Sequence, residues 1–153
     1  MKFLVLLRHG IAEDATPEKS DADRELTAEG RRKMEEIAAG LAYVFPEAEE
    51  IYSSPAVRAM QTAEPVAREY GLKIKASDLL APAQSSRKLV DQVEVEYAIF
   101  VGHEPTLSKL MKELTKISGE IELKKGGCYG IAFEGDSARL EWMLAPRVLR
   151  RLR

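Results

Sequence analysis

Two short apolar runs, each followed directly by a histidine motif, constrain the fold of this chain more than any other feature. Residues 3–7 read Phe-Leu-Val-Leu-Leu and lead into Arg8 and His9, and residues 97–101 read Tyr-Ala-Ile-Phe-Val and lead toward His103. Continuous apolar runs of this length are typical of buried parallel strands. In open α/β sheets, ligands bind just beyond the carboxyl ends of such strands. We therefore expect the only two histidines of the chain to share one pocket.

Strand and helix patterns alternate along the rest of the chain, which predicts an α/β fold. Apolar runs predict strands at residues 2–7, 50–53, 72–75, 97–101, 128–133 and 139–144. Helical spacing and start signals predict helices at residues 27–44, 54–70, 85–93 and 105–114. We expect a three-layer sandwich with a mostly parallel central sheet flanked by helices, to which the last two strands add an antiparallel edge.

Several residues predict where the helices begin and end. Thr27 is expected to cap the first helix, and Ser54 to cap the second, with Pro55 at its first helical position. Pro65 is expected to kink or split that second helix, and Gly71 to close it.

The composition predicts one soluble cytoplasmic domain of residues 1–153. A net charge of -2 gives no reason to expect nucleic acid or a membrane as partner, and we expect a monomer. No apolar stretch is long enough to span a bilayer. The single cysteine, Cys128, excludes an internal disulfide and a multi-cysteine metal site, and its pattern predicts a buried strand position. The C-terminal arginines are expected to form a solvated tail that could attract an acidic partner; they are Arg147, Arg150, Arg151 and Arg153.

His9 suits nucleophilic attack on phosphorus, because a neutral imidazole nitrogen is a recognised covalent nucleophile. Its other nitrogen must then donate to a fixed acceptor, for which a backbone carbonyl of the following loop is expected. Gly10 would let the backbone turn tightly and approach the phosphate. A histidine at a strand end can also be purely structural, but Arg8 beside it and the second histidine at the same topological position favour chemistry.

Arg58 and His103 complete the expected phosphate pocket. Arg58 lies early in a predicted helix, from which a guanidinium can fork onto phosphate oxygens. His103 can donate to a phosphoryl oxygen, most strongly when an anionic phosphate keeps it charged. A metal site is the competing use of a histidine pair. It is disfavoured because no metal-binding spacing is present and the neighbouring arginines would repel a cation.

Four motifs in order resemble those of the histidine phosphatase superfamily (phosphoglycerate-mutase-like), and above all its small SixA-type phosphohistidine phosphatases. They are Arg-His-Gly at residues 8–10, Arg-Glu-Leu-Thr-Ala-Glu-Gly at 24–30, the stretch from Ser-Ser-Pro to Gln-Thr at 53–62, and Val-Gly-His-Glu-Pro at 101–105. The resemblance covers nearly the whole chain. It implies the α/β sandwich of that family.

The resemblance also implies the roles of the site residues. His9 would be the nucleophile, and Arg8, Arg58 and His103 would bind the phosphate, with no cofactor and no metal. The activity implied is hydrolysis of phosphohistidine on a protein, through a phosphohistidine on the enzyme. The partner would be a phosphorylated protein such as a histidine-containing phosphotransfer domain.

One departure from larger members of that family bears on the substrate. They carry a glutamate acid after the third strand, where this chain has only Asp78, which suits a turn. The stretch from Ala76 to Tyr97 is also too short for a substantial lid. Alkoxide leaving groups need a proton from the enzyme, whereas a protonated phosphohistidine depends less on one. Glu13 and Asp14, after His9, could orient water but are expected to be solvated loop carboxylates.

Two other functions stay open at this point. One is a small-molecule phosphomonoesterase or mutase of the same superfamily, which the missing glutamate disfavours. The other is a module that binds a phosphorylated protein without turnover, which the complete set of Arg8, His9, Arg58 and His103 disfavours.

Overall fold

The computed structural model describes residues 1–152. The strands are β1 (Phe3–Arg8), β2 (Glu50–Ser53), β3 (Ile74–Ala76), β4 (Tyr97–Gly102), β5 (Cys128–Glu134) and β6 (Ser137–Leu144). The α-helices are α1 (Ala28–Val44), α2 (Val57–Tyr70), α3 (Arg87–Gln92), α4 (Thr106–Thr115) and α5 (Pro146–Leu149). Two short 3₁₀ helices are η1 (Asp21–Asp23) and η2 (Asp78–Leu80). The expected strands and long helices are all present, with ends that differ by a few residues.

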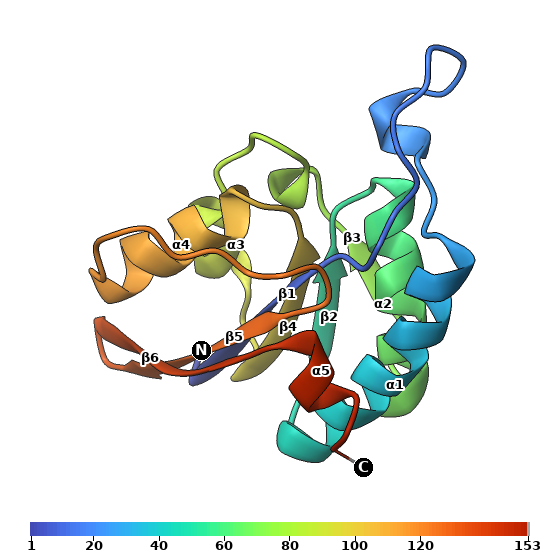
Figure 1. The fold of residues 1–153 in the computed structure, drawn as a ribbon. Coiled ribbons are helices and arrows are strands. Elements are labelled where there is room, and N and C mark those ends of the chain that lie inside the picture. Colours follow the sequence, from blue (N-terminus) through green and yellow to red (C-terminus); the bar gives the residue numbers. More distant parts are fainter. Residues whose placement is uncertain (153) are drawn as a thin grey trace.

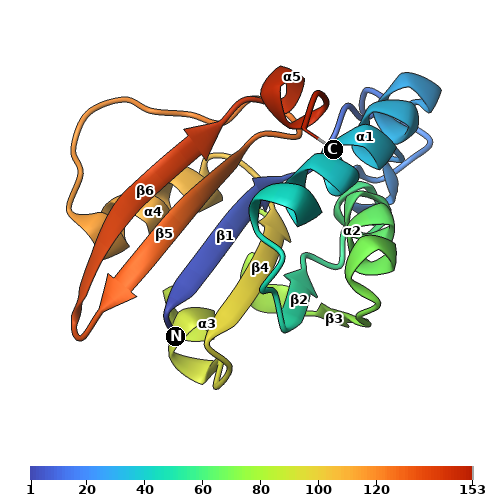
Figure 2. The ribbon, with the colours of Figure 1, turned by 90° about the horizontal axis from the view of Figure 1, so that it is seen from below.

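The strands form one sheet in the order β3-β2-β4-β1-β5-β6 (Figure 2). The pairs β2–β3, β2–β4 and β1–β4 are parallel, whereas β5 and β6 run antiparallel. The expected antiparallel edge is therefore confirmed. The two apolar runs, β1 and β4, lie side by side at the centre, where both faces of a strand are covered.

The sheet separates two apolar cores, because alternate side chains of a strand point to opposite faces. Val5 and Leu7 pack toward α1 and α2, whereas Leu4 and Leu6 pack toward α3 and α4. All four of these side chains are fully buried. Figure 1 shows α1 and α2 on one side of the sheet and α3 and α4 on the other, so the predicted three-layer sandwich is confirmed.

The first helix begins as its sequence predicts, and the second does not. Thr27 caps α1, and its side chain accepts a hydrogen bond from the Gly30 N–H. Helix α2 begins at Val57 rather than at Pro55, and its N-cap is Ala56. The Ser54 hydroxyl does accept a hydrogen bond from the Ala56 N–H, at 3.2 Å, but it lies before the helix.

Of the kink or split expected at Pro65, the split does not occur. The helix runs unbroken from Val57 to Tyr70, with Pro65 inside it and Gly71 closing it in the left-handed conformation at φ 65°. Proline removes one backbone hydrogen bond. Packing of the buried face, which includes Ala63, Pro65 and Val66, offsets that loss, since tertiary packing supplies most of the stability of a helix in a protein.

The C-terminal segment is not a solvated tail. Residues 146–149 form α5, which packs against α1 with Leu149 fully buried. Arg150 is half-buried and forms an ion pair with Glu36 at 3.2 Å. Arg147 and Arg151 are exposed, as expected, and Arg153 lies outside the described residues. A four-residue helix has no sequence period of its own, so only its contacts with α1 could reveal it.

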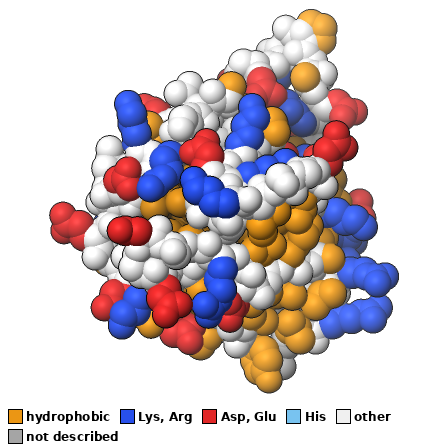
Figure 3. Space-filling model, turned by 90° about the vertical axis from the view of Figure 1, so that its left-hand side faces the viewer, with side chains coloured by type: hydrophobic (Ala, Val, Ile, Leu, Met, Phe, Trp, Pro, Cys, Tyr) orange, Lys and Arg blue, Asp and Glu red, His pale blue; other side chains and the backbone are white. Residues whose placement is uncertain are grey.

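Cys128 is fully buried in β5, as predicted. Burial raises the pKa of its thiol to about 12. Large apolar side chains stay exposed at Tyr43, Ile117, Met143 and Val148. Figure 3 shows one side of the molecule, on which hydrophobic side chains gather in one area bordered by Lys and Arg. Within residues 1–152, no helix combines the length and the apolar character needed to cross a membrane.

Candidate active site

The parallel pairing of β1 with β4 brings the two histidines together. Arg8 lies opposite Gly102 in the register, so the next residue of each strand end is a histidine. The ring centroids of His9 and His103 are 5.2 Å apart, with 54° between the ring planes. Both side chains are buried. The two histidines that were expected to lie together therefore do so, at the carboxyl ends of these strands.

His9 is held in one orientation by the loop that follows it. Its Nδ1 lies 2.8 Å from the carbonyl oxygen of Gly10, so that nitrogen carries the proton and donates it. Nε2 therefore keeps its lone pair. Burial is the main cause that lowers the pKa of His9 to about 3, and the nearby charge of Arg58 and Arg8 adds to it. The imidazole is neutral at pH 7, as a nucleophile must be.

The Gly10 backbone, which the sequence leads us to expect near the phosphate, makes its hydrogen bonds within the protein. Its N–H donates to the Thr62 hydroxyl at 2.9 Å, and its carbonyl accepts from His9. The Thr62 hydroxyl in turn donates to the Arg58 carbonyl at 2.8 Å. A Cβ at Gly10 would lie 2.8 Å from the side chain of Met34, so any larger residue here would force Met34 of α1 to shift.

His103 is oriented by the residue that was expected to cap α2. Its Nε2 lies 2.8 Å from the Ser54 hydroxyl. Its Nδ1 is buried and has no hydrogen-bond partner among the described residues. Burial and the charge of Arg58 lower the pKa of His103 to about 4. An anion beside this ring would favour its protonated form and reverse that effect.

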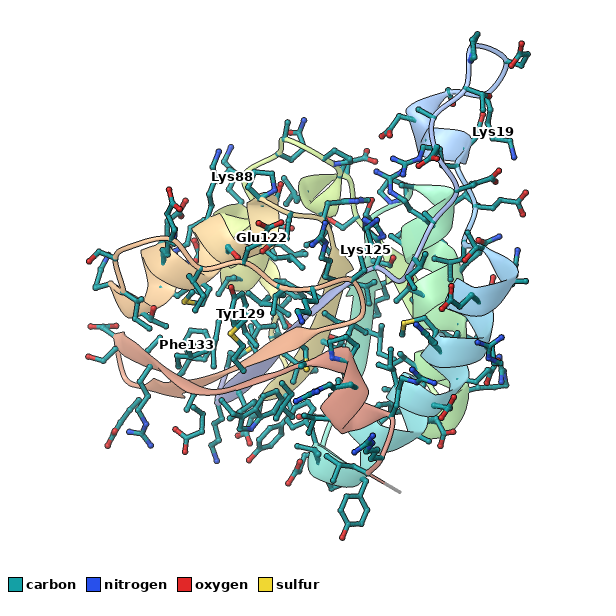
Figure 4. The ribbon with its side chains drawn as sticks, in the orientation of Figure 1. Lys19, Lys88, Glu122, Lys125, Tyr129 and Phe133 are labelled. Atoms are coloured by element: carbon teal, nitrogen blue, oxygen red, sulfur yellow. The ribbon has the colours of Figure 1, made fainter. Side chains whose placement is uncertain are left out.

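Two arginines flank the histidine pair. Arg58 is 4% exposed, and its Nη1 and Nη2 donate to the backbone carbonyl and the carboxylate of Asp21, at 2.7 and 3.1 Å. The Nη1 of Arg8 donates to the Leu123 carbonyl. It also lies 3.5 Å from the carboxylate of Glu122, which Figure 4 labels on the loop before β5. These contacts fix the orientation of both guanidinium groups.

The unpartnered polar atoms of the molecule gather at this site. Four buried side-chain nitrogen or oxygen atoms in residues 1–152 lack a hydrogen-bond partner, and three of them are Arg8 Nε, Arg58 Nε and His103 Nδ1. Buried polar groups are nearly always paired, so each such group needs an explanation. Two are cationic donors, and the third becomes a donor on protonation. Together they suit a tetrahedral oxyanion placed next to His9.

The sequence did not single out Asp21 or reveal the place of Arg24 at the site. Asp21, in η1, bridges Arg58 and Arg24, whose Nη1 lies 2.9 Å from the Asp21 carboxylate. These contacts lower the pKa of Asp21, and the hydrogen bond from Arg24 is the largest cause. Arg24 was noted only as part of the motif before α1. No local pattern could have found Asp21, because its contact with Arg58 depends on how the loop after β1 folds back.

Glu104, next to His103, holds the loop that supports Arg8. Its carboxylate accepts hydrogen bonds from the N–H of Leu123 and of Ser108, each at 2.8 Å. It also accepts one from the Ser108 hydroxyl, which contacts the hydroxyl of Tyr129. The Leu123 N–H thus donates to Glu104, while the Leu123 carbonyl accepts from Arg8. Glu104 is a positioning residue for Arg8.

The other carboxylates noted in the sequence form no hydrogen bond or ion pair with the histidine pair or with the two arginines that flank it, within residues 1–152. Asp78 is exposed in the first turn of η2, as expected of a turn residue. Glu13 accepts from Lys19 at 3.1 Å and from the Glu25 N–H at 2.9 Å, so it organises the loop after β1. Asp14 is exposed. Residues 1–152 contain no group of three or more His, Cys, Asp or Glu side chains arranged to hold a metal ion.

Comparisons with known proteins show what this chain is similar to. The model of the histidine phosphatase superfamily (branch 1) matches residues 4–84. An uncharacterized protein from Picosynechococcus sp. is 32% identical over 137 residues, which cover 84% of this chain and 83% of that protein. A candidate phosphohistidine phosphatase, SixA, from Agrobacterium tumefaciens is 28% identical with a TM-score of 0.80, covering 95% of this chain and 98% of that one. The protein histidine phosphatase SixA complexed with tungstate is 22% identical, with a TM-score of 0.83 and coverage of 96% and 99%.

Proposed function

The chain belongs to the histidine phosphatase superfamily (branch 1), and from this premise we propose that it hydrolyses phosphohistidine on a protein through a phosphohistidine at His9. We further propose that residues 1–153 act as one domain and without a metal ion. The partner is a phosphorylated protein, such as a histidine-containing phosphotransfer domain.

The observation that carries the proposal is the set of unpartnered donors around a nucleophile with a free lone pair. Nδ1 of His9 is committed to the Gly10 carbonyl, which leaves Nε2 for attack. Arg8 Nε, Arg58 Nε and His103 Nδ1 are the groups available to a phosphoryl oxygen. Donors that are already in place where charge develops are the largest single source of catalysis in phosphoryl transfer.

In the first step the lone pair of His9 Nε2 attacks phosphorus. A P–N bond to His9 forms while the P–N bond of the substrate breaks, and its electron pair stays on the substrate imidazole. That imidazole leaves neutral when its second nitrogen is already protonated. The ring of His9 becomes cationic, and the Gly10 carbonyl stabilises it through the Nδ1–H. Arg8 and Arg58 stabilise the charge on the equatorial oxygens.

In the second step water attacks the same phosphorus from the side that the substrate has left. The new P–O bond forms as the P–N bond to His9 breaks, and the electron pair returns to Nε2. One proton of the water passes to the released phosphate or to solvent. His9 is again neutral, with its proton still on Nδ1.

Neither Asp21 nor Asp78 is suited to protonate a leaving group, which favours phosphohistidine over a sugar phosphate. Asp21 contacts Arg58, but its lowered pKa makes it a poor proton donor. Asp78 is exposed in η2. A phosphohistidine needs no proton from the enzyme when its ring is already protonated, whereas an alkoxide leaving group does. Between β3 and β4 the chain forms only η2 and α3, so the pocket has no large insertion over it.

The experiment compares substrates and identifies the labelled residue. The purified protein in EDTA is incubated with a phosphohistidine-bearing protein, p-nitrophenyl phosphate and sugar phosphates. We expect fast release only from the first, with a phosphoryl group trapped on the peptide that contains His9. His9→Ala should abolish both, and the exposed Lys88→Ala should change neither. Fast release from sugar phosphates would favour the small-molecule alternative, and no release from any substrate would favour a binding module.

A further inference from the structure

A cavity lies beside Gly10 and Ile11, the residues that follow His9, and neither histidine lines it. It measures about 360 Å³ and is bounded by α1, α5 and the turn before β5. Its apolar wall includes Ile11, Met34, Ile37 and Pro146. Cavities of this size are at the lower end of those that bind ligands. One large apolar side chain, such as Leu or Phe, would fit it.

The rim of this cavity is strongly basic. Five cationic side chains line it, and no acidic side chain does; they are Lys33, Lys124, Lys125, Arg147 and Arg150. Lys33 pairs with Glu29 at 2.8 Å and Arg150 with Glu36 at 3.2 Å. The other three have no ion pair in residues 1–152 and are exposed. Because the whole chain carries a net charge of -2, this rim is a local concentration of positive charge.

The backbone that holds His9 in place also lines the cavity. Gly10 lines it, and the carbonyl of the same residue accepts the proton of His9 Nδ1. The Gly126 N–H donates to the carbonyls of Arg8 and His9, each at 3.1 Å, so the turn with Lys124 and Lys125 is bonded to the end of β1. A ligand in the cavity would therefore lie next to the catalytic loop.

We propose that this basic-rimmed cavity docks an acidic segment of the phosphoprotein substrate that carries one large apolar side chain. The inference rests on the proposed function. The apolar side chain enters between Met34 and Pro146, and neighbouring Asp or Glu side chains meet Lys125 and Arg147. Complementary charge of this kind steers encounter and fixes register. This docking would give a function to the basic side chains of the C-terminal segment, which their contacts within the protein do not.

The first test measures binding without catalysis. A fluorescein-labelled peptide of Asp and Glu with one central Phe is titrated with the full-length protein, and anisotropy reports the Kd. The double variant Lys125→Glu/Arg147→Glu is compared with Lys73→Glu/Lys88→Glu, which changes the net charge equally. Figure 4 shows Lys125 near the chain that follows β1, and Lys88 far from it, pointing outward.

The cavity variant should bind the peptide about tenfold more weakly, because each reversed charge turns an attraction into a repulsion. The control variant should bind within about twofold of the wild type. Replacing the Phe of the peptide by Ser should also weaken binding about tenfold, since one buried apolar side chain is lost. Equal weakening in both double variants, or no effect of the Phe, would overturn the inference.

The second test separates this inference from the proposed function. With a phosphohistidine-bearing protein, the cavity variant should show a KM raised about tenfold at unchanged kcat. Its slow hydrolysis of p-nitrophenyl phosphate should keep the kcat/KM of the wild type. If the cavity variant hydrolyses the phosphohistidine-bearing protein with the KM of the wild type, the docking inference is refuted and the proposed function is not. Peptide binding as expected without any hydrolysis of phosphohistidine would refute the proposed function and leave the acidic docking site supported.

Discussion

Both site histidines are uncharged in the folded protein at pH values where a free imidazole is protonated. Burial is the main cause that lowers the pKa of His9 to about 3 and that of His103 to about 4 from an ordinary 6.5. In the unfolded chain both rings bind protons below pH 6.5. Protonation therefore stabilises the unfolded state, and the free energy of unfolding falls as the pH drops from 6.5 toward 4. Above pH 6.5 neither state binds these protons, so the effect vanishes.

The effect is large enough to measure. At pH 5 each histidine lowers the free energy of unfolding by about 2 kcal/mol relative to pH 7.5, and the pair by about 4 kcal/mol. Urea unfolding of the wild type and of His9→Gln/His103→Gln at both pH values gives the difference. The wild type should lose about 4 kcal/mol more than the double variant, since the carboxylates titrate alike in both. The same pH dependence in the two proteins would show that the folded state does not hold these rings neutral.

Three further predictions concern the anion site and the C-terminal helix. Sulfate, whose charge is constant between pH 5 and 8, should bind more tightly as the pH falls, because it favours protonation of His103. In calorimetric titrations this trend should vanish in His103→Gln. A trend that persists in that variant would assign the proton to another group. Asp21→Ala should tighten sulfate binding about threefold, since it frees Nη2 of Arg58 and removes an exposed negative charge; weaker binding would mean that the carboxylate is needed to orient the guanidinium. Gly40→Ala should cost about 3 kcal/mol in urea unfolding, because its Cβ would lie 1.8 Å from the Leu149 carbonyl oxygen; wild-type stability would show that α5 moves away at no cost.

The sequence predicts the centre of this molecule better than its edges. β1 and β4 are apolar on both faces, so their burial and their place in the sheet follow from residues 3–7 and 97–101 alone. The ends of parallel strands meet at one edge of a sheet, and this rule brings His9 and His103 together without any knowledge of the loops. Local pattern and tertiary structure agree at these positions.

The prediction fails where a contact between distant segments decides the structure. Ser54 has the chemistry of a helix cap, but its hydroxyl contacts His103, which directly follows β4. Pro65 is a local helix breaker, yet the buried face of α2 keeps the helix continuous. The place of Asp21 depends on its contact with Arg58, and the position of α5 depends on its packing against α1. Propensity describes a residue and its neighbours, so it cannot report partners brought near by folding.

The parallel pairing of β1 with β4 has a consequence for how activity arises. Phe3 pairs with Tyr97 and Arg8 with Gly102, so the first strand must find a partner that is made much later along the chain. Such long loop closures are slow, because their entropy must be lost before the contacts reward it. His9 and His103 lie side by side only after this step. A refolding chain should therefore recover helical signal early and enzymatic turnover late, and no fragment that lacks either strand can be active.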